Sequence, residues 1–237
     1  MKASIILATY NEKGNIIKLI RDILDNCKRE QINCEIIIVD DNSPDGTAAA
    51  VKKSFRTDKR VKLILRKNER GLGTAVGRGV REASGDVLVF MDADFSHDPE
   101  DIPKLVKLTK DHDIVNGSRH IKGGGMESTP FRKFASLAGK SSGKLYMGLI
   151  LGLNITDYTN GFFAARKSVI DKLNSDKIFY GYGDYYFRLF YHAKNNGSTI
   201  KEIPVFYKFR EEGESKTNFL KHGFQYMKEG LKLRFGS

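Results

Sequence analysis

The apolar residues in the first half of the chain form short runs, and longer stretches with helical spacing separate these runs. The clearest run, Val87–Met91, follows the turn residues Gly85 and Asp86 and contains five consecutive apolar side chains. An unbroken run of this length is typical of a strand that is buried on both faces of a parallel sheet. We predict five such strands, at Ala3–Ala8, Glu35–Val39, Val61–Leu65, Val87–Met91 and Asp113–Gly117.

Helices are predicted between these strands. The first follows the turn Thr9–Glu12 and ends at about Cys27, and the second runs from about Thr47 to Phe55. The third follows the turn Asn68–Gly73 and ends near Ser84 and Gly85, and the fourth begins at Pro99. Proline suits the first turn of a helix, which supports the last of these starts. Strands separated by helix-length segments predict βαβ units with right-handed crossovers. The predicted fold class is therefore α/β, with a Rossmann-like, mostly parallel sheet flanked by helices.

The second half of the chain is less regular. We predict helices at Pro130–Leu153, from Lys167 onward and at Asp184–Lys194, and extended segments at Phe162–Ala165 and Thr199–Tyr207. No internal repeat, low-complexity tract or linker separates the halves. One domain with two functional halves fits this pattern best.

The tail from Asn218 to Phe235 has the pattern of a basic amphipathic helix. Its apolar stripe and its flanking cations are Leu220, Phe224, Met227, Leu231 and Phe235, and Lys221, Lys228, Lys232 and Arg234. Such a helix can lie in a membrane interface, or it can pack on its own domain as an ordinary terminal helix. The spacing leaves both interpretations open.

The charge balance narrows the class of partner. The 237 residues include 40 basic and 29 acidic ones, and the net charge of +11 favours phosphate-bearing substrates, nucleic acid or an anionic membrane surface. Cys27 and Cys34 are too few for a disulfide framework, so we expect a reducing, cytosolic setting. No window reaches the roughly 18 apolar residues of a spanning helix, and we expect neither such a helix nor a signal peptide.

Polar residues gather where the predicted strands end. Tyr10 and Glu12 follow the first strand, Asp41 follows the second, and Asp92 and Asp94 follow the fourth. Ligands of open α/β sheets bind outside the carboxyl ends of the strands, and two carboxylates there suit a hard divalent cation. The pair could instead simply end its strand and cap the next helix. No G-x-G-x-x-G follows the first strand and no phosphate-loop lysine motif occurs, which disfavours dinucleotide-binding and ATPase functions.

Several segments resemble a known family. Ala8–Glu12, Val39–Thr47, Gly71–Ala75 and Met91–Glu100 are similar to the motifs of the family 2 glycosyltransferases, and more narrowly of the dolichyl-phosphate mannose synthases. The resemblance continues through Gly117–Arg119, Arg132–Ser136, Asp157 and Arg210–Lys216, so it spans nearly the whole chain in the same order.

The resemblance implies a GT-A fold for residues 1–217, with a nucleotide-sugar half at 1–117, an acceptor half at 118–217 and the amphipathic helix at 218–237. It implies an inverting enzyme that uses Mg²⁺ or Mn²⁺ to move mannose from GDP-mannose to a dolichyl or other polyprenyl phosphate. The implied partners are these substrates, a membrane surface and a membrane-anchor subunit where one exists, with no nucleic acid. A peripheral position on the cytosolic face of a membrane follows.

The resemblance also implies roles for single residues. Nucleotide-sugar binding is implied for Ala8, Tyr10, Glu12, Val39, Asp41, Asp92, Ala93, Asp94, Arg210 and Lys216. The acceptor phosphate is implied to meet Arg119, Arg132 and Ser136, the metal to meet Asp92, Asp94 and Ser96, and the catalytic residues to be Asp94, Arg119 and Arg132. The chain departs from the family pattern at Ala8, where proline is usual, and at Ser96, where other members have glutamine. Asp184 does not align securely with the acidic residue of its region, and His97 is expected to be a bystander.

The chemistry agrees with this resemblance. A phosphate monoester has a second pKa of about 6, so it is mostly an anion near neutral pH and needs no strong general base. The site must supply positive charge and alignment, which suits a chain rich in Arg and Lys. One alternative keeps the fold and changes the donor to another sugar nucleotide, such as UDP-glucose, or the acceptor to a glycan. A more distant one is a basic nucleic-acid-binding protein, although no nucleic-acid motif is present.

Overall fold

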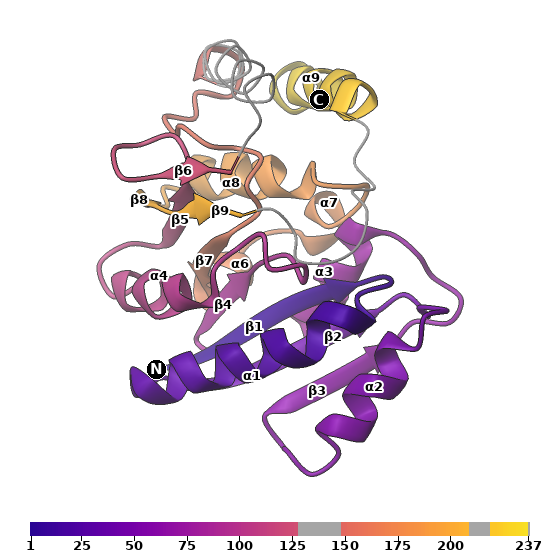
Figure 1. The fold of residues 1–237 in the computed structure, drawn as a ribbon. Coiled ribbons are helices and arrows are strands. Elements are labelled where there is room, and N and C mark those ends of the chain that lie inside the picture. The colour runs from indigo at the N-terminus through magenta and orange to yellow at the C-terminus, as the bar shows by residue number, and fades with distance from the viewer. Residues whose placement is uncertain (128–147, 209–218, 237) are drawn as a thin grey trace.

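The computed structural model describes residues 1–127, 148–208 and 219–236. Within these ranges, a seven-stranded sheet has the order β3-β2-β1-β4-β7-β5-β8, and a small second sheet pairs β6 with β9 (Figure 1). The strands are β1 Lys2–Thr9, β2 Asn33–Asp40, β3 Val61–Leu65, β4 Val87–Phe90, β5 Ile114–Ser118, β6 Gly125–Met126, β7 Phe163–Arg166, β8 Ile200–Pro204 and β9 Phe206–Tyr207. The helices are α1 Lys13–Arg29, α2 Thr47–Ser54, α3 Leu72–Glu82, the 3₁₀ turn η1 Pro99–Asp101, α4 Ile102–Leu108, α6 Lys167–Ile170, α7 Ser175–Ile178, α8 Tyr185–Asn195 and α9 Phe219–Phe235.

The structure confirms the five predicted strands and the mostly parallel sheet. It also adds a feature that the sequence pattern did not predict, because β7 runs antiparallel between β4 and β5. All other described pairings in the large sheet are parallel. The segment predicted at Phe162–Ala165 is therefore the strand that joins the two parts of the sheet.

Helices cover both faces of the sheet, which is why β4 is apolar on both sides. Leu88 and Phe90 face the layer that contains α3 and α8, whereas Val87 and Val89 face the layer of α1 and α4 (Figure 1). Phe90 stacks on Phe163 of β7 with 4.3 Å between the ring centroids. Complete burial of a side chain of this size stabilises the fold by about 1.5–3 kcal/mol, so this run anchors the centre of the sheet.

The carboxyl ends of the parallel strands form the edge at which a site is expected. The chain passes from β1 to β2 and β3 on one side, and then crosses to β4 on the other side of β1. A crevice for ligands opens at such a switch point. The loops there hold Asn11, Asn42 and Phe95 at φ values of 60°, 55° and 63°. Left-handed backbone at such residues costs of order 1–3 kcal/mol each and is concentrated at functional sites.

The C-terminal helix α9 packs on α8 with one face. Tyr226 meets the ring of Phe187 edge-on, with 5.4 Å between centroids. Glu229 lies 3.2 Å from the guanidinium of Arg188, which is completely buried and also lies 2.6 Å from Asp184. The interpretation of the tail as a helix packed on its own domain is therefore correct for this face.

The opposite face of α9 remains exposed. Met227, Leu231 and Phe235 are 44%, 46% and 72% exposed. These residues belong to the apolar stripe predicted from the sequence, while the side chains of Leu220, Phe224 and Lys221 lie outside the described part. The helix predicted at Pro130–Leu153 lies mostly outside it too, although residues 148–151 are helical. Among the described helices, none is long and apolar enough to cross a membrane.

Candidate active site

The loop after β1 carries Tyr10 and Glu12. The guanidinium carbon of Arg70 lies 3.8 Å from the centroid of the Tyr10 ring, so a cation covers one face of this aromatic side chain. The carboxylate of Glu12 accepts a hydrogen bond from Asn15 Nδ2 at 2.9 Å, and its backbone N–H donates to Thr47 Oγ1 at 3.0 Å. These contacts fasten the loop after β1 to the loop after β2.

Asp41 is buried at the end of β2 and already has charged and polar partners. Its Oδ1 lies 2.6 Å from Nε and 2.5 Å from Nη2 of Arg66, and its Oδ2 accepts from the backbone N–H of Gly71 at 2.8 Å. Arg66 was not predicted as a site residue. Ala8 and Val39 are directly paired in β1 and β2 next to this cluster. The predicted nucleoside residues therefore occupy neighbouring strand ends.

The turn after β4 places the predicted diphosphate residues together. Asp94 is 4% exposed, and its Oδ1 accepts from the backbone N–H of Ser96 at 3.0 Å and from Ser96 Oγ at 2.5 Å. Ala93 is buried and Asp92 is half-buried. The hydroxyl of Ser96 thus orients Asp94, and its predicted contact with a metal stays a prediction.

His97 is part of this turn and is 1% exposed. Its Nδ1 lies 3.0 Å from the backbone nitrogen of Asp92, and its Nε2 lies 3.2 Å from Asn160 Oδ1. Burial lowers the pKa of His97 to about 4, so the ring is neutral near pH 7. It is therefore a buried, hydrogen-bonded residue, and the expectation that it is a bystander to the metal stays a prediction.

Two tyrosines lie within the electrostatic reach of Asp92. Burial raises the pKa of Tyr207 to about 12, and the charges of Asp92 and Asp94 act in the same direction. Burial and the charge of Asp92 also raise the pKa of Tyr185. Both phenols therefore remain protonated near neutral pH.

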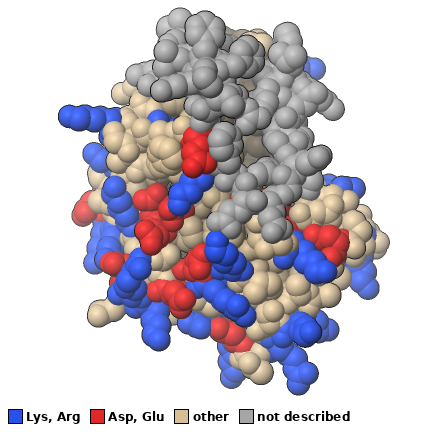
Figure 2. Space-filling model, in the orientation of Figure 1, with Lys and Arg blue, Asp and Glu red and all other residues tan. Residues whose placement is uncertain are grey.

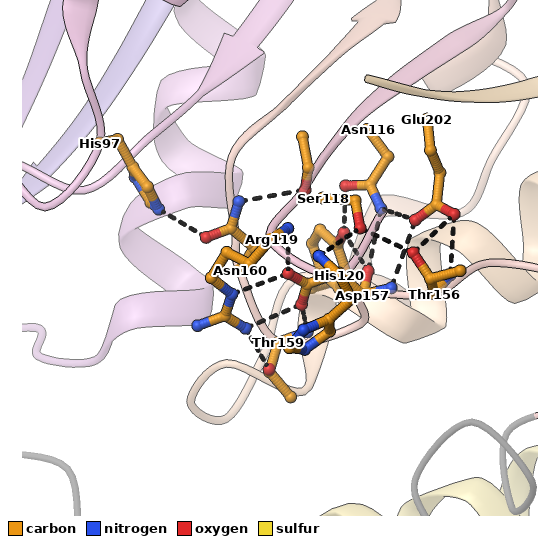
Figure 3. Close-up of polar contacts among 12 residues, drawn as sticks. His97, Asn116, Ser118, Arg119, His120, Thr156, Asp157, Thr159, Asn160 and Glu202 are labelled. Carbon is orange, nitrogen blue, oxygen red and sulfur yellow. Dashed lines mark hydrogen bonds and ion pairs between the residues drawn. The ribbon is translucent and has the colours of Figure 1, made fainter. Parts of the chain in front are cut away.

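Arg119 follows β5 and is held rigidly by the loop before β7 (Figure 3). Its Nε and Nη2 donate to the two carboxylate oxygens of Asp157 at 2.7 and 2.8 Å, and Nη2 also donates to Thr159 Oγ1 at 2.7 Å. Burial would raise the pKa of Asp157, but the charge and hydrogen bonds of Arg119 outweigh it and lower that pKa. Among the described residues, these bonds use Nε and Nη2 of Arg119 and leave Nη1 for a further acceptor.

A second group of polar residues supports the loop that carries Asp157. Glu202 of β8 accepts hydrogen bonds from the backbone N–H groups of Thr156 at 2.9 Å and of Asp157 at 3.2 Å, and from Asn116 Nδ2 at 3.2 Å (Figure 3). The hydroxyl of Tyr186 donates to the carbonyl oxygen of Asp157 at 3.0 Å. Because these groups are buried or half-buried, their hydrogen bonds fix the loop and with it the direction of Arg119.

The carboxylate side and the arginine side of the site meet at Tyr207. The guanidinium of Arg119 lies 5.3 Å from the centroid of the Tyr207 ring, and the charges of Asp92 and Asp94 act on the hydroxyl of the same residue. The structure therefore brings together residues from strand ends that are far apart in the sequence. Arg132, Ser136, Arg210 and Lys216 lie outside the described residues.

The side chains at this edge of the sheet can be compared with those that bind a divalent cation. Within the described residues, no group of three or more His, Cys, Asp or Glu side chains is placed to hold a metal ion. Mg²⁺ is usually bound by one or two carboxylates together with substrate phosphates and water. Asp92 and Asp94 fit this kind of shared site, in which the substrate completes the coordination.

Sequence reasoning missed Arg66, Thr159 and Asn160. A signal for the last two was present, because the polar turn Asp157–Gly161 directly precedes an apolar strand. A turn before a strand reaches the carboxyl edge of its parallel neighbours only if that strand is antiparallel. The apolar pattern of the four-residue segment Phe162–Ala165 does not reveal the direction of the strand.

The sheet has the GT-A type of fold, and the class of protein is a glycosyltransferase. The family model described as glycosyl transferase family 2 matches residues 4–173. The chain belongs to this family.

Curated relatives extend the similarity over most of the chain. A dolichol-phosphate mannosyltransferase of Pyrococcus furiosus is 39% identical over 236 residues, which are 96% of this chain and 64% of that protein. An undecaprenyl-phosphate mannosyltransferase of Micrococcus luteus is 35% identical, and the match covers 100% of both chains. A polyprenol monophosphomannose synthase of Mycolicibacterium smegmatis is 32% identical over 90% of this chain and 79% of its own. The chain thus spans about two thirds of the length of the Pyrococcus protein.

A solved structure shares the fold. Glucosyl-3-phosphoglycerate synthase from Mycobacterium tuberculosis, in complex with Mn²⁺, UDP-glucose and phosphoglyceric acid, superposes with a TM-score of 0.70 at 18% identity. The match covers 98% of this chain and 79% of that one. At this level of identity the likeness establishes the fold alone.

Proposed function

We propose that this protein transfers mannose from GDP-mannose to a dolichyl or other polyprenyl phosphate, with inversion at the anomeric carbon. The products are the lipid-phosphate-linked mannose and GDP. Three relatives support the sugar and the acceptor class, because each is named for mannose together with a polyprenol or its phosphate. The assignment of guanine as the base of the donor rests on the resemblance of the segments that are implied to bind the nucleoside.

One observation carries the proposal: Tyr207 lies between the two sides of the site, with the guanidinium of Arg119 5.3 Å from the centroid of its ring and the ring of His97, in the turn of the carboxylates, 5.4 Å from it. A transfer between two phosphates needs these two kinds of charge close together. The carboxylates serve the donor diphosphate through a cation, and the arginine serves the acceptor phosphate. Because Asp157 and Thr159 hold Arg119 in one orientation, little conformational entropy is lost when it binds a phosphate.

The acceptor phosphate is the nucleophile. Its second pKa of about 6 leaves it mostly dianionic near pH 7, so no side chain has to remove a proton before attack. Arg119 aligns this phosphate. Asp92 and Asp94 would hold Mg²⁺ or Mn²⁺, which would supply positive charge to the leaving diphosphate. Both phosphates are then held in line across the anomeric carbon.

The remaining roles are proposed on sequence similarity. Arg210 and Lys216 bind the donor diphosphate, and Arg132 and Ser136 bind the acceptor phosphate beside Arg119. Ala8, Tyr10, Glu12, Val39 and Asp41 form the nucleoside end. Residues 1–117 then bind the nucleotide sugar and residues 118–217 bind the acceptor.

A transfer assay tests the proposal. Radiolabelled GDP-mannose, Mn²⁺ and a short polyprenyl phosphate should give an organic-extractable mannosyl phospholipid and GDP. Asp94→Asn should lower the rate by about 100-fold or more, because an isosteric neutral amide removes a charge that acts on the leaving group. Asp111→Asn, on an exposed loop, is the matched control and should keep the wild-type rate.

Two outcomes would redirect the proposal. Turnover of UDP-glucose without turnover of GDP-mannose would change the donor, and transfer to a glycan but not to the lipid phosphate would change the acceptor. A nucleic-acid-binding function would be favoured by salt-sensitive DNA binding without any donor turnover. Figure 2 shows Lys and Arg interspersed with Asp and Glu on the face in view, which is unlike the continuous basic stripe of a nucleic-acid surface.

We further propose that α9 holds the protein at the cytosolic face of a membrane. Met227, Leu231 and Phe235 are exposed on its outer face, and the cations Lys228, Lys232 and Arg234 are exposed beside them. Near an anionic surface each such cation adds about 1 kcal/mol of attraction. The inner face stays on α8, so docking needs no unfolding of the helix.

Vesicle co-sedimentation tests this position without disturbing the inner face. Lys228→Glu/Lys232→Glu should weaken binding to anionic vesicles and leave the melting temperature unchanged. Lys52→Glu/Lys53→Glu makes the same change in charge on α2, at the far end of the molecule from α9, and should bind as the wild type does (Figure 1). Equal losses in both double variants would point to net charge alone.

A further inference from the structure

His97 lies in a tightly defined environment next to the proposed metal-binding turn. Its ring stacks on Phe162, with 4.8 Å between centroids and 16° between planes, and meets the ring of Tyr207 edge-on at 5.4 Å. With aromatic rings on two sides, the imidazole has one plane and little freedom to rotate. The positions of its two nitrogens are therefore fixed.

The two nitrogens have distinct partners, and these partners identify the tautomer. A backbone N–H can only donate, so Nδ1 accepts from Asp92 at 3.0 Å and carries no proton. The proton is then on Nε2, which donates to Asn160 Oδ1 at 3.2 Å. Asn160 Nδ2 donates in turn to the carbonyl oxygen of Gly117 at 3.1 Å. All three bonds run in one direction, from the turn after β4 to the end of β5, and Figure 3 shows the bond between His97 and Asn160.

The bond to Asp92 has a structural purpose. β4 ends at Phe90, and the ladder no longer provides partners for the backbone of the following turn. Phe95 in the same turn has a φ of 63°, a conformation that surrounding contacts must maintain. A phenylalanine in place of His97 would fill the same space and leave the N–H of Asp92 without this acceptor. Packing alone therefore does not explain a histidine here.

The bond to Asn160 reaches the other side of the site. Asn160 belongs to the same loop as Asp157 and Thr159, the two residues that hold Arg119. His97 thus connects the turn of the carboxylates with the loop of the arginine. A change at either end would move the other through one part-buried and one buried hydrogen bond.

We propose that His97 is a positioning residue, which fixes the turn of Asp92 and Asp94 for cation binding and sets its distance from the loop that orients Arg119. This inference rests on the proposed function. His97 touches neither substrate nor cation in this role, and it acts through the backbone of Asp92 and the side chain of Asn160.

Three substitutions separate the two hydrogen bonds. His97→Phe keeps an aromatic ring and removes both bonds. His97→Asn can place Oδ1 near the position of Nδ1 and so keeps an acceptor for Asp92. His97→Gln can place an amide N–H near the position of Nε2 and so keeps a donor for Asn160. His112→Phe, after α4 on the surface, is the matched control for a histidine-to-phenylalanine change.

The measurement is Mn²⁺ binding in the presence of GDP, followed by the electron paramagnetic resonance signal of free Mn²⁺. Loss of an outer partner of a metal site typically weakens metal affinity by about 10–100-fold, and we expect a loss in this range for His97→Phe. His97→Asn should stay close to the wild type, and His97→Gln should resemble His97→Phe. In the transfer assay His97→Gln should need more Mn²⁺ while its kcat at saturating Mn²⁺ recovers.

The outcomes distinguish this inference from the proposed function. A wild-type protein that binds neither GDP nor Mn²⁺ would overturn the proposed function and this inference with it. Wild-type binding with unchanged Mn²⁺ affinity in His97→Phe would show that His97 only fills space. If His97→Phe does not fold, the Asn and Gln variants decide, and equal Mn²⁺ affinities in those two would overturn the inference.

Discussion

Replacing Arg188 with methionine should destabilise the protein strongly, because it leaves buried carboxylates without their partner. Arg188 is completely buried, and its guanidinium lies 2.6 Å from Asp184 and 3.2 Å from Glu229, whose side chains are 3% and 13% exposed. Its Nε also donates to the carbonyl oxygen of Ile178 at 2.9 Å. Removing one member of a buried ion pair costs about 3–5 kcal/mol.

This cost can be converted into a melting temperature. For 237 residues the entropy of unfolding near the midpoint is about 0.5 kcal/mol/K, so Arg188→Met should melt about 6–10 °C below the wild type. Differential scanning calorimetry measures the shift, and urea unfolding gives the free energy. Glu229→Gln in the Arg188→Met background should recover part of the loss, because one unpaired charge is then removed.

Arg78→Met is the matched control. Arg78 pairs with Glu82 at 2.9 Å with the same spacing of four residues, but the two side chains are 46% and 42% exposed. An exposed helical pair contributes only about 0.3–0.5 kcal/mol. Similar losses in Arg78→Met and Arg188→Met, or a loss below about 1 kcal/mol in Arg188→Met, would refute the role assigned to burial.

Two further predictions concern other parts of the sheet. Burial alone would raise the pKa of Glu35, but hydrogen bonds from Ser4, Ser84 and Lys2 outweigh it and hold the pKa far below its ordinary value. The resulting stability is present above the unfolded-state pKa of about 4.3 and is lost as the pH falls below it. In urea unfolding, the free energy of unfolding should therefore fall more steeply from pH 5 to pH 3 in the wild type than in Glu35→Gln. Gly73→Ala should destabilise by about 1–3 kcal/mol, because the new methyl would lie 2.5 Å from the carbonyl oxygen of Tyr180. Gly148→Ala, whose methyl would meet nothing closer than 3.9 Å among the described residues, should not, and thermal melting of both variants decides.

Much of the fold follows from local patterns. The apolar runs that predicted β1 to β5 are strands because each buries both of its faces, as Val89 and Phe90 do. The position of Asp92 and Asp94 at the carboxyl edge follows from the same pattern, since both come directly after such a run. Tertiary contacts with no local signal were not predicted. Arg188 lies on a helix with an amphipathic sequence pattern, which does not predict its burial or its ion pair with Asp184. Nothing in the sequence around Asp41 indicates that it forms an ion pair with Arg66.

The site was predicted unevenly for the same reason. The carboxylates lie on loops that begin where a strand ends, so sequence order places them. Arg119 was expected near a phosphate, but its hydrogen bonds to Asp157 were not predicted. They depend on the antiparallel direction of β7, and the apolar pattern of Phe163–Arg166 does not reveal the direction of the strand. The burial of His97 was not predicted, because a histidine beside polar residues in a loop is typical of an exposed position. In the structure, the rings of Phe162 and Tyr207, which are distant in the sequence, cover it.

The insertion of β7 also sets the order in which the chain can complete its sheet. In the described sheet, β7 is the link between β4 and β5, so β5 and β8 cannot join β4 until Phe163–Arg166 is available. During synthesis from the N-terminus, β1 to β4 are made early, and the edge of β4 stays unpaired until β7 has been synthesised much later. An unpaired apolar edge invites aggregation. A fragment that ends after residue 117 would keep this edge open, so the chain before and after this residue forms a single folding unit.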